Sequence, residues 1–145
     1  MRSVLAVRIP RWMAGGAVFM SMLSVFLAQG GAPEAGEKWK APARKAKAAN
    51  PVEANAESMA RGRKLYEANC LSCHGVAGKG DGAEAAKLDR SPGDLTRIEG
   101  QTDGELFWKI TVGRKPMPAY ENTFSEGERW DVVNYTRSLT QAVKK

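Results

Sequence analysis

One pentapeptide, Cys70-Leu71-Ser72-Cys73-His74, limits the chemistry of this 145-residue chain more than any other feature. It contains both cysteines and the only histidine in the sequence. The spacing C-x-x-C-H is typical of sites where haem is attached covalently. Two thiols add across the two vinyl groups on one edge of the porphyrin, and the imidazole that follows binds the iron from one side. The motif therefore predicts a haem c cofactor that is bound by Cys70, Cys73 and His74.

The same C-x-x-C pair also occurs in redox disulfides and in zinc sites. A redox disulfide of the thioredoxin type lies in a βαβ unit, and the sequence around Cys70 has no strand pattern. A zinc site usually has four protein ligands, drawn mostly from cysteine and histidine. No further cysteine or histidine remains once the motif is used, so covalent haem is the interpretation that the sequence favours.

The N-terminus has the pattern of an export signal, which we predict over residues 1–30. Arginines at positions 2, 8 and 11 precede an apolar run from about Met13 to Ala28, and small residues follow at the usual cleavage positions. The run is shorter than the ~20 residues that a membrane-spanning helix needs. We therefore expect cleavage, with an uncleaved membrane anchor as the alternative. Both place the rest of the chain in the periplasm or on the extracytoplasmic face of the membrane.

Residues 31–57 are rich in alanine, proline, lysine and glutamate, and Trp39 and Val52 are their only large apolar residues. Such a segment buries too little surface to offset the entropy of ordering, so we predict a flexible linker. We predict that residues 58–145 form the working domain. Its fourteen basic and twelve acidic side chains leave a charge of only +2, which gives no indication of nucleic-acid binding.

The domain of residues 58–145 has helix signals and no strand signals. The predicted helices cover about 59–69, 82–88, 102–112 and 125–139, and a capping pattern precedes each of the last three: Asp81-x-x-Glu84, Thr102-x-x-Glu105 and Ser125-x-x-Glu128. Gly62 lies inside the first helix, where glycine costs roughly 1 kcal/mol relative to alanine, and it predicts the close approach of another helix. The fold class is therefore all-α. Because a domain this small has a limited core, we expect the apoprotein to be poorly folded.

From about Ser58 to Leu139 the chain resembles the class I c-type cytochromes, in the monohaem bacterial form found in respiratory chains. The resemblance rests on MARGRKLYEANCLSCHG, GKGDG, SPGDLT, TDGELFWKITVGRKPMPAY and SEGERWDVVNYTRSL, in this order. It implies the small class I cytochrome c fold, with helices packed around one covalently bound haem. In that fold the first and last helices cross near Gly62, and Tyr66 packs against the last helix.

The resemblance also implies a second axial ligand to the iron, Met117, in the loop of residues 115–118. The sequence agrees, because no second histidine exists, four of the six methionines lie in the export segment, and Met59 lies on the first helix. The prolines on either side of Met117 favour extended backbone. The resemblance further implies that the carbonyl of Pro92 accepts a hydrogen bond from His74, although Pro92 can equally serve as a turn former.

An iron with two strong axial ligands favours one-electron transfer over catalysis, so we predict an electron carrier and not an enzyme. We expect redox protein partners, such as a membrane respiratory complex or an oxidase, and membrane association if the N-terminal segment is retained. The alternative is a haem protein with an open iron position, a peroxidase or a gas-ligand sensor. That alternative requires Met117 to be absent from the iron, and the chain has no distal histidine to act as acid or base.

Overall fold

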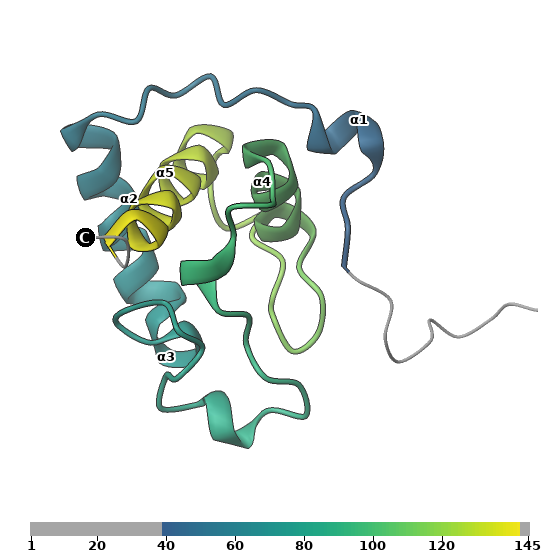
Figure 1. Ribbon diagram of the computed structural model, residues 1–145, viewed down its shortest axis with the longest axis vertical. Coiled ribbons are helices and arrows are strands. Elements are labelled where there is room, and N and C mark those ends of the chain that lie inside the picture. The colour runs from purple at the N-terminus through teal and green to yellow at the C-terminus, as the bar shows by residue number, and fades with distance from the viewer. Residues whose placement is uncertain (1–38, 143–145) are drawn as a thin grey trace, which may run out of the picture. The chain divides into compact units, whose positions relative to one another are not determined.

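A computed structural model describes residues 39–142 of the chain. Its elements are α1 (Ala43–Ala46), α2 (Ala56–Asn69), α3 (Leu71–His74), the 3-10 turns η1 (Ala85–Lys87) and η2 (Leu95–Arg97), α4 (Asp103–Val112) and α5 (Glu126–Ala142). Among these described residues there is no strand, only an isolated bridge between Arg114 and Met117. The predicted all-α class is confirmed (Figure 1). The expected export signal, residues 1–30, lies outside the described residues. Within residues 39–142, no helix is long and apolar enough to cross a membrane.

Helix ends follow the predicted capping patterns at α4 and α5. The Thr102 hydroxyl accepts a hydrogen bond from the Glu105 N–H at 3.2 Å, and α4 ends at a glycine with φ of +61°. Ser125 and Glu128 form a reciprocal box, in which the Ser125 N–H donates to the Glu128 carboxylate at 2.8 Å and the Ser125 hydroxyl accepts in return. Both predicted starts are therefore confirmed.

Two predicted helices differ from the observed elements. The first begins at Ala56 rather than near Met59, because the Asn55 side chain caps it by accepting from the Ser58 N–H at 2.9 Å. The helix expected up to Leu88 is only the short turn η1, which has no side-chain cap. That segment contains a single large apolar residue and so has no face to bury, and helices this short gain their stability from packing.

The crossing of α2 and α5 forms the frame of the fold (Figure 1). A Cβ placed on Gly62 would lie 2.0 Å from the backbone oxygen of Asp131, so only glycine allows this approach. One turn later, the rings of Tyr66 and Tyr135 pack with their centroids 5.2 Å apart. The predicted close approach at Gly62, and the packing of Tyr66 on the last helix, are both confirmed.

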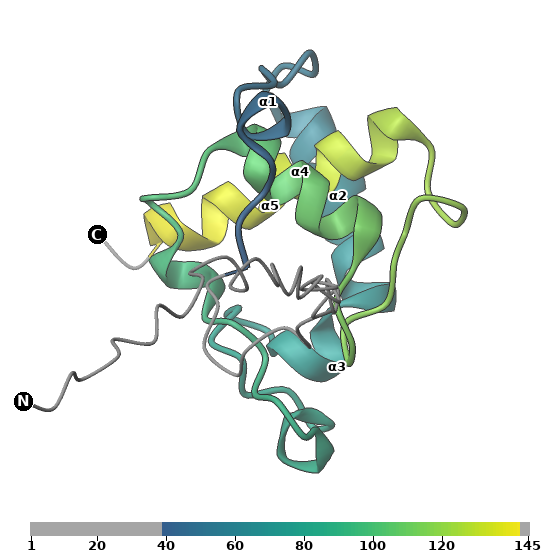
Figure 2. The same cartoon turned by 90° about the vertical axis from the view of Figure 1, so that its right-hand side faces the viewer.

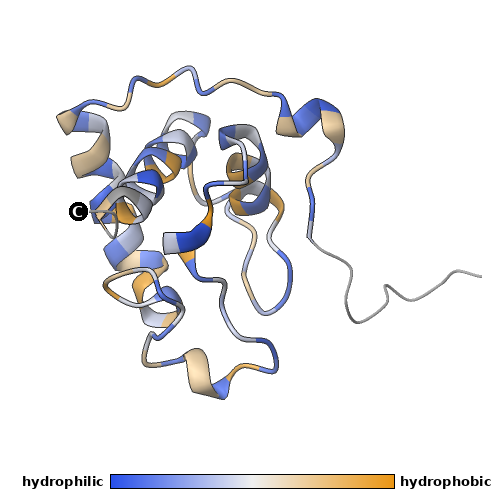
Figure 3. Ribbon diagram, viewed as in Figure 1, coloured by the Kyte–Doolittle hydropathy of each residue, from blue (hydrophilic) through white to orange (hydrophobic). Residues whose placement is uncertain are grey.

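A second layer is formed where α4 packs against α5. Phe107 of α4 stacks on Trp130 of α5 with ring centroids 4.0 Å apart. Around this pair lies a core cluster of buried residues, Ile98, Leu106, Trp130 and Val133. Figure 3 shows hydrophobic stretches on the ribbons of both α4 and α5.

Residues 39–55, here named the N-terminal strap, lie along the domain and differ in this respect from the flexible linker expected over 31–57. Its short helix α1 packs beside α4, as both Figure 1 and Figure 2 show. Val52 packs against the core cluster, and Asn50 donates a hydrogen bond to Asn134 of α5 at 2.7 Å. The composition did not indicate this packing, because it depends on a few specific contacts. Residues 31–38 of the expected linker lie outside the described range.

Candidate functional site

A cavity of about 310 Å³ lies between the strap, α2, α3, α4 and α5. This volume lies in the range of sites for small organic ligands and cofactors. All five predicted site residues line it: Cys70, Cys73, His74, Pro92 and Met117. Large apolar side chains from both core layers, among them Leu106, Ile110 and Val132, form much of the remaining wall.

The two cysteines and the histidine lie on one turn of helix. Cys70 ends α2, where its N–H donates to the Tyr66 carbonyl at 2.8 Å, and it also caps the start of α3. Cys73 and His74 follow at i+3 and i+4 from Cys70, so the three side chains share one face. Gly75 then ends the turn with φ of +78°, a conformation in which glycine is strongly favoured.

The hydrogen-bond partner of His74 differs from the prediction. Its Nδ1 lies 3.1 Å from the carbonyl oxygen of Gly93, not that of Pro92. The Pro92 carbonyl instead lies beside Gly80, where an added Cβ would be only 2.6 Å away. Because a carbonyl only accepts, Nδ1 is the donor, and Nε2 has the free lone pair that a metal requires.

Burial favours the uncharged forms of Cys70 and His74. It raises the pKa of the Cys70 thiol to about 12, with a further contribution from the neighbouring Cys73. Burial also lowers the pKa of His74, against the opposing effect of its hydrogen bond to the Gly93 carbonyl. A neutral imidazole is the form of histidine that binds metal ions.

Met117 reaches the same cavity from the loop between α4 and α5. The backbone N–H groups of Arg114 and Met117 donate to each other's carbonyls at 3.0 and 2.9 Å, which closes a tight turn. The Lys115–Pro116 peptide bond within this turn is cis. The Met117 side chain is half-buried and packs against the cluster of Tyr120, Phe124 and Val132.

The wall residues that were not among the predicted site residues include Trp39, Gln101 and Lys109. Trp39 was visible as one of only two large apolar residues in the expected linker, although nothing local showed what it contacts. Gln101 and Lys109 are joined by a hydrogen bond at the cavity wall. Their role as lining residues depends on how α4 packs, which no local pattern encodes.

These residues fit a covalently bound haem. The two thiols and the imidazole share one helical turn, the second ring nitrogen of the imidazole is hydrogen-bonded, and a thioether lies in the same cavity wall. The thiols would join the porphyrin edge, and the imidazole and the thioether are the donors of His/Met-ligated haem. The apolar wall would contact the porphyrin faces.

Comparison with known proteins agrees with this site. Residues 57–135 match the family described as "Cytochrome C oxidase, cbb3-type, subunit III". The chain is 25% identical over 84 residues to the cytochrome bc1 complex cytochrome c subunit of Corynebacterium diphtheriae, a match that covers 57% of this chain and 28% of the relative. It is 28% identical over 81 residues to cytochrome c6 of Anabaena variabilis, which covers 56% of this chain and 91% of the relative.

A solved structure, the reducing HAO-like protein complex of Kuenenia stuttgartiensis, resembles the fold with a TM-score of 0.59 and 29% identity. The match covers 63% of this chain and 47% of that one. The chain thus spans about a quarter of the Corynebacterium relative and about half of the Kuenenia chain. Because the family match extends over more than half of its length, the chain belongs to the cbb3-type cytochrome c oxidase subunit III family and contains a cytochrome c electron-transfer domain with covalently bound haem c.

Proposed function

We propose that Cys70 and Cys73 attach the haem through thioether bonds and that His74 and Met117 bind its iron from opposite sides. The domain then passes single electrons between redox proteins outside the cytoplasm. One observation carries this proposal: both thiols, the imidazole and the Met117 side chain line the same cavity.

Bound haem supplies an iron that alternates between Fe(II) and Fe(III). The hydrogen bond from His74 Nδ1 to Gly93 fixes the ring orientation and leaves Nε2 as the ligand atom. Ligation by the Met117 thioether raises the reduction potential. The apolar walls act in the same direction, because a dry site disfavours the additional positive charge of the oxidised iron.

The partners that we propose are proteins of a respiratory-type electron-transfer chain. Similarity to a bc1 complex cytochrome c subunit supports this class of partner. Carriers that must exchange electrons repeatedly bind their partners through small contacts, typically with a buried area below about 1,200 Å².

The proposed location is the periplasm or the extracytoplasmic face of the membrane, because c-type haem is attached there. Fractionation together with the mass of the mature N-terminus tests this location, and recovery of the chain in the cytoplasm would contradict it.

The ligand assignment is tested by Met117→Ala. The variant should keep its covalent haem, lose the sulfur-to-iron charge-transfer band of the oxidised protein, and show a lower reduction potential. Reduced wild-type protein should be inert to carbon monoxide, whereas the variant should bind it rapidly. Met59→Ala is the matched control, because Met59 lies on α2 and does not line the cavity.

The same experiment decides between the carrier and an open-site haem protein. Rapid and stoichiometric binding of carbon monoxide by the wild type at neutral pH would favour a peroxidase or a gas-ligand sensor. An oxidised Met117→Ala spectrum that equals the wild-type spectrum would refute Met117 as a ligand. Haem that dissociates from the wild type in acidified organic solvent would refute covalent attachment by Cys70 and Cys73.

A further inference from the structure

One wall residue of the cavity precedes the family domain in the chain. Trp39 lines the cavity together with both cysteines, His74 and Met117, but it precedes the matched residues 57–135. A tryptophan side chain buries a large apolar area at such a position. The strap therefore adds a part to the site that the matched domain does not contain.

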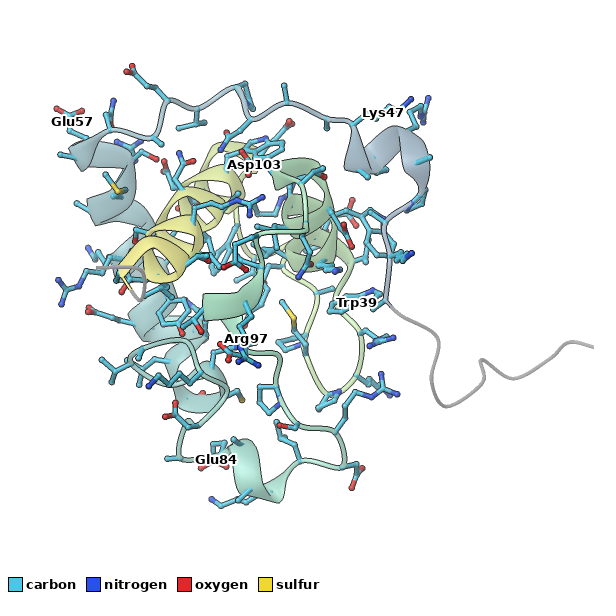
Figure 4. The ribbon with its side chains drawn as sticks, viewed as in Figure 1. Trp39, Lys47, Glu57, Glu84, Arg97 and Asp103 are labelled. Carbon is cyan, nitrogen blue, oxygen red and sulfur yellow. The ribbon has the colours of Figure 1, made fainter. Side chains whose placement is uncertain are left out.

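Trp39 is held between an aromatic ring and two cationic side chains. Its ring lies 6.2 Å from that of Trp108 on α4, with an interplanar angle of 59°. The Arg114 guanidinium carbon lies 4.9 Å from the Trp39 ring centroid, and the Lys109 Nζ lies 5.7 Å from it. Contacts of this kind stabilise the position of the ring, and more strongly when they are desolvated. In Figure 4, Trp39 lies beside the loop that follows α4, on the other side of the view from α3.

The backbone behind Trp39 is seated on the N-terminal end of α4. A Cβ added to Gly104 would lie 2.3 Å from the carbonyl oxygen of Lys45 and 2.8 Å from that of Ala48, so the strap requires glycine there. The Thr102 hydroxyl, which caps α4, also donates a hydrogen bond to the carbonyl of Ala46. These contacts fix the position along α4 at which the strap crosses the helix.

A second anchor joins the far end of the strap to the helix crossing. Asn134 on α5 accepts from the Asn50 side chain at 2.7 Å. Its own amide group donates to the Ser58 hydroxyl at 2.8 Å and to the Val52 carbonyl at 3.2 Å. Asn134 is only 5% exposed, so losing these bonds would leave a buried amide without partners. The strap is thus attached at both ends and is a fixed wall.

We propose that Trp39 is a positioning residue of the haem site: the strap presses its ring against the cavity, excludes water from that side of the haem, and so raises the reduction potential. This inference rests on the proposed electron-transfer function. Its physical basis is the dependence of the potential on solvent exposure. Water admitted beside the haem stabilises the oxidised form, which has one more positive charge than the reduced form.

The test is a redox titration of Trp39→Ala, Trp39→Phe and Lys40→Ala in the haem-loaded full chain. Trp39→Ala should have a lower midpoint potential, with at least about a threefold shift toward the oxidised form at a fixed mediator potential. Trp39→Phe retains an aromatic wall and should restore most of the wild-type value. Lys40→Ala, an exposed neighbour that does not line the cavity, should leave the potential unchanged.

Gly104→Ala provides an independent arm, because it displaces the strap without removing any side chain from the cavity. It should lower the potential in the same direction as Trp39→Ala, and it decides the question if Trp39→Ala fails to fold. A Trp39→Ala potential equal to that of Lys40→Ala, or an unchanged potential in Gly104→Ala, overturns the proposal. Retention of the sulfur-to-iron band in these variants keeps this outcome separate from a failure of the ligand assignment.

Discussion

At the crossing of α2 and α5, two helices meet directly through Gly62, and an aromatic pair and a buried carboxylate complete the contact. Residues 75–101, which lie between α3 and α4, have a different construction. Their only secondary structure is the two short turns η1 and η2. The backbone at the start of the segment bends at three glycines with positive φ, Gly75, Gly78 and Gly80. The first part of the segment is bonded to the backbone around α3, for example by Gly80 N–H to the His74 carbonyl at 2.9 Å. Its last part is bonded to α5, where Thr140 donates to the Leu95 carbonyl at 2.9 Å and Arg137 donates to the Ile98 carbonyl at 3.0 Å.

The two regions differ in what they pack against. The crossing packs protein against protein, so its stability should depend little on the cofactor. Residues 88, 90–95 and 98 line the cavity, so one side of this segment has the haem as its packing partner. Residues 95–101 also pack against α5, so we infer that the crossing is the frame and that residues 75–94 are ordered largely by what fills the cavity.

The largest expected effect comes from removing the haem. An unfilled cavity of 310 Å³, at about 24 cal/mol per Å³, costs about 7 kcal/mol, which is comparable to the whole stability of a small domain. Apoprotein made by changing both Cys70 and Cys73 to serine should therefore lose cooperative thermal unfolding. Its remaining amide protection should be found in α2 and α5 and should be absent from residues 75–94.

Hydrogen exchange followed by peptide mass analysis checks this prediction, with the haem-loaded wild type as the control. Equal protection of α5 and residues 75–94 in the apoprotein would contradict the division between frame and cofactor-ordered segment. A sharp calorimetric transition of the apoprotein, near that of the loaded protein, would contradict the size of the cavity effect.

The next largest effect should come from Gly62→Ala. The new methyl group would meet backbone atoms of Asp131 at 2.0 and 2.6 Å, and backbone cannot rotate away as a side chain can. Overpacking of this kind costs about 3 kcal/mol. Gly127→Ala is the matched control: Gly127 lies in the other helix of the crossing, α5, with nothing within 4 Å of the added methyl, and the change should stabilise by about 0.5 kcal/mol.

Urea titrations of both glycine variants with haem bound measure these two changes. The same sign for both would show that the crossing is not the tight contact described above. Because Gly62 does not line the cavity, the reduction potential of a folded Gly62→Ala protein should stay near the wild-type value.

The sequence predicted the crossing and the haem motif well, because both depend on local signals. Each of these signals can be recognised from a few neighbouring residues: a glycine within a helical pattern, a Ser-x-x-Glu box or a C-x-x-C-H motif. The Gly93 partner of His74 was missed by one position, because the approach of Gly80 decides which carbonyl faces the imidazole. The strap was missed for a similar reason. Its order comes from contacts with Gly104 and Asn134, far along the chain, and its composition does not reveal them.

A buried carboxylate makes the crossing sensitive to acid. Burial favours the neutral form of Asp131, but hydrogen bonds from Arg61 and Ser58, together with the charge of Arg61, outweigh it and lower its pKa. The lower pKa in the folded state means that the ionised group stabilises the fold above the ordinary carboxyl pKa. That contribution is lost as the pH falls through the folded-state pKa.

Asp131→Asn should therefore lower the free energy of unfolding by about 1.5 kcal/mol near pH 7. The difference between variant and wild type should shrink as the pH falls through the lowered folded-state pKa of Asp131, where the carboxyl becomes neutral like the amide. Urea titrations at a series of pH values measure this difference, and effects of the haem ligands cancel because both proteins share them. A difference that stays constant with pH would show that the charge of Asp131 has no part in the effect.

The smallest expected changes come from two caps, one in each region. Ser125→Ala removes the cap of α5, at the frame, and should lower the free energy of unfolding by about 1 kcal/mol without moving the reduction potential. Asp94 caps η2 by accepting from the N–H and the hydroxyl of Thr96 at 2.9 and 2.6 Å, and it directly follows Gly93, whose carbonyl accepts from His74. Asp94→Ala should therefore move the potential, because a looser Gly93 carbonyl would polarise the His74 imidazole, the proposed iron ligand, less. Redox titration of both variants separates the regions: a shift in Ser125→Ala with none in Asp94→Ala would reverse the roles assigned to them.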